Sequence, residues 1–335
     1  MITGSEAASL LKKNSCGGSR FGCAICLCVS VDESLENMLR QEQYAYMRGL
    51  IDLRNYLAAV RWDMSKRDWV GKNVDKHGYL HIAPENWHAG MVEDLLKFCL
   101  TLDVQEMEAS ARLGLETPRF QLVPAEVLVL IDSLWSYFGQ SRPFHALSIY
   151  REVYREGKRY PIPQVSPSPR VKMGARRYLY IGDIMADEYM FFGLRDVTEE
   201  AMCRSCYDPE PYVVKGGKQY LNVPTDDSLT VNPDGLYFLF EHDMDRLIAE
   251  MHDSPHYART AGMMYYLSTG LISIGKGQHS RADAILRRSR LREAKGLIWP
   301  YPGIDFERDT ISVAEYVQAT GELPPDLDRG SLQLF

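Results

Sequence analysis

Apolar residues recur at helical spacing in the region that follows residue 32. They mark one face of a helix, and they are Leu39, Tyr46, Leu50, Leu53, Leu57 and Val60. Asp32 or Ser34 can accept a hydrogen bond from the first turn of such a helix. The pattern predicts one long amphipathic helix over residues 34–62, followed by a loop that contains Gly71 and Gly78.

Further helical patterns follow before a proline-rich stretch. The apolar spacing predicts a helix over residues 91–113 and another that opens at Pro124, a residue suited to a first helical turn. The segment RPFHALSIYREVYREG continues as helix until Gly157. The next segment, YPIPQVSPSPR, contains four prolines, which do not fit inside regular elements. We therefore expect a linker or a long ordered loop there.

Shorter apolar runs between Tyr178 and Phe240 favour strands. The runs YLYIGDI and LYFLF alternate with turn signals such as the NPDG sequence at residues 232–235. Helical patterns return over residues 243–252, 258–271 and 281–295. These patterns predict an α+β fold that is predominantly α-helical, with a minor β region around residues 178–240.

The same patterns predict how the chain is divided. Residues 1–32 form a Cys-rich metal-binding segment, residues 33–160 a helical domain, and residues 161–335 a C-terminal α+β region. With 335 residues and 45% apolar composition, the chain can bury a sizeable core. The sequence has no run of eighteen apolar residues, and its opening MITGSEAASLLKKNS has no apolar leader region. We expect a soluble cytoplasmic protein with no membrane partner.

The seven cysteines carry the clearest chemical signal. Four of them fall between residues 16 and 28, and two more form a C-x2-C pair at positions 203 and 206. In a reducing cytosol, such clustering favours metal binding over disulfides. The first group is a C-x6-C-x2-C pattern with an additional cysteine two residues on: Cys16, Cys23, Cys26 and Cys28. Thiolates are soft ligands that suit an iron–sulfur cluster or zinc.

Three of these sulfurs can reach one metal centre, since Cys23 and Cys26 lie in a single turn and Cys16 reaches it across a Gly-Gly bend. The fourth ligand is Cys28, the pair at positions 203 and 206, or a cysteine of a partner chain. The pair could also be a redox site or ordinary free thiols. The alternative for the first group is unligated thiols. The remaining cysteine, in the apolar run LLKFCL, is interpreted as a core residue.

The cysteine motif is also the part of the sequence that resembles a known family. CGGSRFGCAIC followed by VSVDESLENML resembles the cysteine motif and downstream helix of the phosphoadenosine phosphosulfate (PAPS) reductase-like family, particularly its DNA phosphorothioation (DndC-type) members. The stretch IDSLWSYFGQSRPFHALSIYREVYREGKRYPIP is similar to the helical region that follows the motif in phage and bacterial members. Together these segments cover roughly residues 15 to 165.

The resemblance implies a cytoplasmic enzyme in which an ATP-pyrophosphatase-like α/β domain works with a 4Fe–4S cluster. Cys16, Cys23 and Cys26 correspond to the cluster ligands, and the family's fourth ligand lies upstream, a place that Cys28 can take here. The sequence departs from the family by Ala24, where a bulky aromatic residue is often seen. It also lacks the Ser-Gly-Gly-x-Asp-Ser loop that holds the nucleotide phosphates.

The expected function is the C-terminal part of a PAPS reductase-like, DndC-type iron–sulfur sulfurtransferase. A separate ATP-pyrophosphatase-like chain or domain supplies the nucleotide-binding half, unless that half is lost. The sulfur acceptor is DNA, tRNA or a small sulfur compound, and the sequence points to no catalytic residue. The alternative is a non-catalytic module in which the same cysteines bind zinc and the helical body binds DNA or a partner protein.

A basic helix and the histidines complete the candidates. Residues 281–295 carry four basic side chains along one face, which can contact DNA phosphates or form a solvated face paired with acidic neighbours. They are Arg281, Arg288, Arg292 and Lys295, with Arg287 and Arg290 on the same helix. The net charge of −7 argues against a protein that coats nucleic acid over its whole surface. No histidine lies in a metal-ligand motif, and His145 is interpreted as a packed or loop-capping residue.

Overall fold

The computed structural model describes residues 33–171, 174–182, 212–215, 218–221, 229–275, 278–302 and 304–328. It is mainly helical with a small antiparallel sheet, so the predicted α+β class is confirmed. The predicted Cys-rich segment lies outside the described residues. Among the residues that are described, no helix is long and apolar enough to cross a membrane.

The chain forms two compact units that are interleaved along the sequence. The first comprises the described residues up to Lys66, Asp94–Leu122, and residues 153–171. The second comprises Arg67–Glu93, Val123–Glu152, and the described residues from Gly174 onward. The regions predicted from the sequence, residues 1–32, 33–160 and 161–335, follow one another along the chain, and that division stays a prediction.

The first unit contains a broken helix followed by a long straight one. Where one helix over residues 34–62 was predicted, the structure has α2 (Glu33–Leu39), η1 (Glu42–Met47) and α3 (Arg48–Val60). The prediction is wrong at this break, because Gln41 has an extended backbone and the residues around it, RQEQ, are all polar. No apolar side chain there can stabilise a continuous helix by packing. The helix predicted over residues 91–113 is confirmed as α4 (Ala89–Arg112), which belongs to the first unit from Asp94 onward.

A buried carboxylate on α4 holds the loop that follows this helix. Glu106 accepts hydrogen bonds from Ser110 and from the backbone and guanidinium of Arg119, at 2.7 to 3.0 Å. The Arg119 guanidinium also lies over the ring of Tyr46, 4.1 Å from its centroid. Burial acts to raise the pKa of Glu106, but the hydrogen bonds from Arg119 and Ser110 outweigh it and lower that pKa. The carboxylate is therefore a structural anchor of the first unit.

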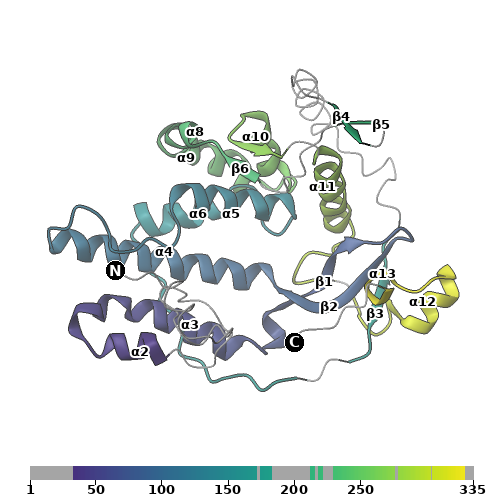
Figure 1. Cartoon of the computed structure of the whole chain (residues 1–335), viewed down its shortest axis with the longest axis horizontal. Helices are drawn as coiled ribbons and strands as arrows, with labels where there is room; N and C mark the ends of the chain where they lie inside the picture. The colour runs from purple at the N-terminus through teal and green to yellow at the C-terminus, as the bar shows by residue number, and fades with distance from the viewer. Residues whose placement is uncertain are drawn as a thin grey trace. The chain divides into compact units, whose positions relative to one another are not determined.

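The second unit is built on a four-stranded antiparallel sheet (Figure 1). Its strands, in the order in which they pair, are β1 (Arg67–Val74), β2 (Tyr79–Trp87), β3 (Arg177–Tyr180) and β8 (Thr310–Ser312). The predicted loop is wrong at Gly71, which lies in β1, and is confirmed at Gly78, which lies in the hairpin turn between β1 and β2. Val70 and Leu80 are buried in the core of this sheet, which offsets the poor strand propensity of the polar residues around them.

The hairpin turn depends on Gly78, whose φ is +82°. A Cβ at this position would lie 2.7 Å from the carbonyl oxygen of Gly182. We expect Gly78→Ala to lower the free energy of unfolding by about 1–3 kcal/mol, because the substitution adds backbone strain and a backbone clash. Urea denaturation measures the change.

Gly114→Ala provides a matched control for this variant. Gly114 has a φ of +68°, yet nothing lies within 4 Å of its added Cβ, so only the backbone strain remains. We expect a loss of about 1 kcal/mol for the control. Equal losses in the two variants would contradict a role for the contact with Gly182.

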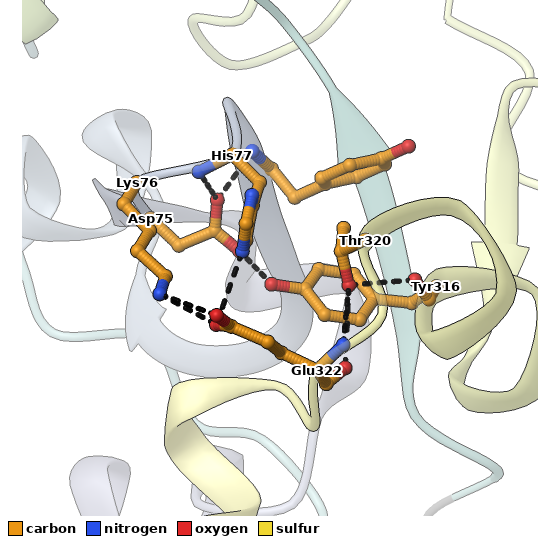
Figure 2. A network of polar contacts seen from close by, with 7 residues as sticks. Asp75, Lys76, His77, Tyr316, Thr320 and Glu322 are labelled. Atoms are coloured by element: carbon orange, nitrogen blue, oxygen red, sulfur yellow. Dashed lines mark hydrogen bonds and ion pairs between the residues drawn. The ribbon is translucent and has the colours of Figure 1, made fainter.

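Asp75, the first residue of the hairpin turn, stabilises the turn through hydrogen bonds, as Figure 2 shows. One carboxylate oxygen accepts the backbone N–H groups of His77 and Tyr79, at 2.8 and 2.9 Å. The other accepts the hydroxyl of Tyr316 at 2.6 Å. Tyr316 is fully buried, and burial together with the neighbouring carboxylate raises its pKa. Asp75 therefore joins the hairpin to α12 (Val313–Thr320), on which Tyr316 lies.

A second set of contacts joins the hairpin turn to the residues that follow α12, and it lies at the surface. Glu322 forms ion pairs with Lys76 at 2.6 Å and with His77 at 3.2 Å (Figure 2). Both Lys76 and Glu322 are more than half exposed, so their ion pair contributes little to stability. The partly buried hydrogen bond between Tyr316 and Asp75 is therefore the contact that stabilises this end of the hairpin.

Helices make up most of the rest of the second unit. The predicted helix at Pro124 is confirmed as α5. The helical patterns near residues 145, 245, 262 and 281 are also confirmed, although some of these helices are shorter than predicted. The run LYFLF, predicted as a strand, is helical because Asn232 caps a helix with Pro233 in its first turn. The elements are α5 (Ala125–Tyr137), α6 (His145–Tyr150), η3 (Arg151–Arg155), β4 (Tyr212–Lys215), β5 (Lys218–Leu221), β6 (Leu229–Val231), α8 (Pro233–Phe238), η5 (Leu239–Asp243), α9 (Met244–Leu247), η6 (Ile248–His252), α10 (Ala261–Ser268), β7 (Ile272–Ile274), α11 (His279–Ala294) and α13 (Pro325–Asp328).

Candidate functional site

The predicted metal ligands cannot be placed in the structure. They lie outside the described residues and are Cys16, Cys23, Cys26 and Cys28, with the pair Cys203 and Cys206. Within the part of the chain that is described, no group of three or more His, Cys, Asp or Glu side chains is arranged to hold a metal ion. Cys99 lies on α4, and burial raises the pKa of its thiol to about 12. A thiol of this kind is inert, which agrees with its interpretation as a core residue.

A row of four titratable side chains lies in the second unit. His145 Nε2 is 3.1 Å from Glu93 Oε2, and His145 Nδ1 is 2.9 Å from His252 Nε2. His252 Nδ1 is in turn 2.7 Å from Asp253 Oδ1. We call these four residues the histidine chain. It joins the first turns of α4, the start of α6 and the end of η6.

The two imidazole rings have the geometry of an in-plane hydrogen bond. Their planes differ by 6° and their centroids are 5.1 Å apart, so a nitrogen of one ring points at a nitrogen of the other. The side chains are partly buried, with 15% of His252 and 23% of His145 exposed. The ring of Trp135 lies 6.0 Å from that of His145. Limited contact with water strengthens hydrogen bonds of this kind.

An unusual turn places His145 at the start of α6. Phe144, just before it, has a φ of +58° in the left-handed region, which a bulky residue rarely adopts. Its ring is fully buried and packs edge-on against Tyr265 and Tyr266, at 5.4 and 5.5 Å. This packing stabilises the turn. The direction of the His145 side chain is therefore set by a buried neighbour.

Asp132 supports the same turn from α5. Its carboxylate is buried and accepts the backbone N–H of Ala146 at 2.7 Å and the hydroxyl of Tyr266 at 2.8 Å. Burial raises the pKa of Asp132 to about 6, although these hydrogen bonds and the charge of His145 act to lower it. Tyr266 is fully buried too, and burial raises its pKa well above the ordinary value. Asp132 thus fixes the residue next to His145.

The chemistry open to the histidine chain is proton exchange. Burial lowers the pKa of His252, and the nearby charges of His145 and Arg142 add to this, while Asp253 opposes it. Imidazoles joined by a hydrogen bond can pass a proton between rings near neutral pH. Both nitrogens of each ring have a partner, so neither ring offers a nitrogen to a metal ion.

The basic face predicted for residues 281–295 is only partly at the surface. Arg292 is buried, 3.9 Å from Asp68, and burial lowers its pKa. Arg287 is buried as well and pairs with Asp283 at 2.6 Å. Lys295 is exposed. Contact between this helix and DNA stays a prediction, and Arg292 belongs to the core side of α11.

Sequence reasoning interpreted His145 as a packed or loop-capping residue and did not identify its partners. His252 is 107 residues away and carries no local signal that would pair it with His145. Asp132 did leave a signal, because it lies on the buried face of α5 among residues such as Leu128 and Trp135. A carboxylate in such a position requires hydrogen-bond donors. Comparisons of this chain with protein-family models, curated proteins and solved structures gave no match.

Proposed function

We propose that this chain is the cluster-binding and helical part of a PAPS reductase-like, DndC-type sulfurtransferase. In this proposal Cys16, Cys23, Cys26 and Cys28 hold a 4Fe–4S cluster. The observation that carries it is the spacing of the motif CGGSRFGCAIC, followed by one further cysteine. Four thiolates within thirteen residues match the needs of a cluster, and the glycines allow close approach of the backbone.

The reaction also requires an activated sulfur or an activated acceptor. The 335 residues contain no Ser-Gly-Gly-x-Asp-Ser loop, whose backbone donors would cradle nucleotide phosphates. The proposal therefore assigns nucleotide binding to a separate ATP-pyrophosphatase-like chain or domain. It places the protein in the cytoplasm, where thiols stay reduced.

Metal analysis of the full chain tests the proposal. After anaerobic purification we expect a brown protein that contains iron and acid-labile sulfide in equal amounts, measured by absorbance and elemental analysis. Zinc without sulfide would overturn the cluster in favour of the non-catalytic zinc module that binds DNA or a partner protein. A protein with neither metal, after reconstitution with iron and sulfide has also failed, would overturn both readings.

The zinc alternative, in its DNA-binding form, requires an exposed basic face on the protein. As a DNA-binding module it would use the basic face of α11, and Arg292 is buried there beside Asp68. Fewer exposed cations mean fewer released counterions and weaker binding to phosphates. This burial weakens the DNA-binding form of the zinc module, and it does not affect the form that binds a partner protein.

A further inference from the structure

The protons of the histidine chain can be counted from its contacts. Ionised carboxylates only accept hydrogen bonds. Glu93 therefore requires a proton on His145 Nε2, and Asp253 requires one on His252 Nδ1, at 3.1 and 2.7 Å. The contact of 2.9 Å between His145 Nδ1 and His252 Nε2 requires a third proton. Two neutral imidazoles carry only two protons in total.

We infer that His145 and His252 hold one extra proton between them and form a pH-sensitive latch that joins α4, α6 and η6. With this proton, every contact of the histidine chain is a hydrogen bond. The pair then carries one positive charge, which lies between the carboxylates of Glu93 and Asp253. This inference does not depend on the proposed function.

Both other protonation states lose a contact. In the neutral pair, two nitrogen lone pairs face each other at 2.9 Å, or one faces a carboxylate oxygen. In the doubly charged pair, two N–H groups face each other at the same distance. Each loss leaves a partly buried polar group without its partner, which weakens the latch. The latch is therefore complete only in the middle of the pH range and weakens on either side.

The charges around the pair favour this single-proton state. Glu93 from α4 and Asp253 after η6 attract one positive charge at each end of the chain. The carboxylate of Asp132 on α5 and the charge of His145 also attract each other. Arg142, before α6, repels a second positive charge on His252. The single proton is thus held from both ends, while a second one is disfavoured.

The direction of the acid effect follows from the lowered pKa of His252. Below the ordinary value of about 6.5 the folded protein binds fewer protons than the unfolded chain, so the latch contributes less stability as the pH falls. Asp132 acts in the opposite direction, because its pKa is raised to about 6 and its contribution falls as the pH rises. Global unfolding mixes the two effects, and a test has to observe the rings themselves.

Imidazole NMR of the full chain, labelled with 15N-histidine, provides that test. We expect the Nδ1 of His145 and the Nε2 of His252 to show a coupling across their hydrogen bond, and the two rings to titrate together. The exposed His256, four residues beyond His252, is the internal control and should show no such coupling. Independent titration of His145 and His252, with no coupling across the contact, would overturn the inference.

Hydrogen exchange tests the consequence for α6. In the wild-type protein we expect the backbone amides of α6 to exchange about tenfold faster at pH 5 than at pH 7, after correction for intrinsic rates. His145→Gln should exchange fast at both pH values, whereas His256→Gln should behave as wild type. A wild-type pH dependence that persists in His145→Gln would overturn the latch. If His145→Gln does not fold, the wild-type NMR result decides.

Discussion

Replacing Asp132 with alanine is expected to lower the free energy of unfolding by about 3 kcal/mol at pH 5. The substitution leaves the backbone N–H of Ala146 and the hydroxyl of Tyr266 buried without an acceptor. Each unpaired buried donor costs about 1–3 kcal/mol, and a small cavity adds to the loss. Urea denaturation followed by circular dichroism measures the change.

The effect of this substitution should depend on pH. The pKa of Asp132 in the folded protein is about 6, above its ordinary value of 3.8. Its stability contribution is therefore fully present below the ordinary value and is lost as the pH rises through about 6. At pH 8 the wild type has lost this contribution, which the variant lacks at every pH, so the difference between them should shrink by about 1–2 kcal/mol.

Glu126→Ala is the control, since Glu126 lies on the exposed side of the same helix. We expect it to change stability by no more than about 0.5 kcal/mol. Tyr266→Phe should give an intermediate loss, because the carboxylate keeps its bond to Ala146. A difference between wild type and Asp132→Ala that stays constant from pH 5 to pH 8 would show that the carboxylate does not titrate in this range.

The simultaneous replacement of Cys16, Cys23 and Cys26 by serine is expected to remove the metal completely. Serine keeps the size of cysteine but its hydroxyl is a poor ligand for iron or zinc. The visible absorbance, the iron and the sulfide should all disappear, as measured on protein purified anaerobically. Because ligation of a metal can hold a chain segment folded, we also expect faster proteolysis before residue 33.

Two further variants complete this experiment. Cys99→Ala should keep the full metal content, because Cys99 is a partly buried thiol on α4 whose raised pKa makes it a poor metal ligand. Cys28→Ser should lower the metal content if Cys28 is the fourth ligand, and the double replacement at positions 203 and 206 should do so if that pair supplies it. Metal that survives the triple replacement would place the site elsewhere in the chain.

Sequence reasoning predicted the elements whose signal is local. The helices α4 and α5 have apolar stripes and α11 is rich in residues that favour helix, and each was located within a few residues. The hairpin of β1 and β2 was missed because its strands are stabilised by distant partners. Leu80 pairs with Leu179, and the core around Val70 includes Leu291 and Tyr301. A local pattern cannot report burial that comes from residues so far along the chain.

The contacts of the candidate site also depend on residues that are far apart in the sequence. His145 stood out in the sequence only as a lone histidine, and its partners Glu93 and His252 come from other elements. Arg292 was read as an exposed cation because arginine is usually exposed, yet a buried Asp68 lies beside it. The cysteine motif is a local pattern, but it lies outside the described residues, so the metal site that it indicates stays a prediction. Contacts across elements determine which polar residues are structural and which are free to react.

The strand order of the second unit also determines when this protein can finish folding during synthesis. β1 and β2 leave the ribosome together and can pair at once, but β2 gains its second neighbour only when Arg177–Tyr180 has emerged. β3 gains its own outer neighbour only with Thr310–Ser312. Until then the nascent chain presents an open strand edge and an incomplete core, which are the features that chaperones bind and that lead to aggregation. Slow translation before residue 310 would therefore lengthen the time for which the growing polypeptide needs protection.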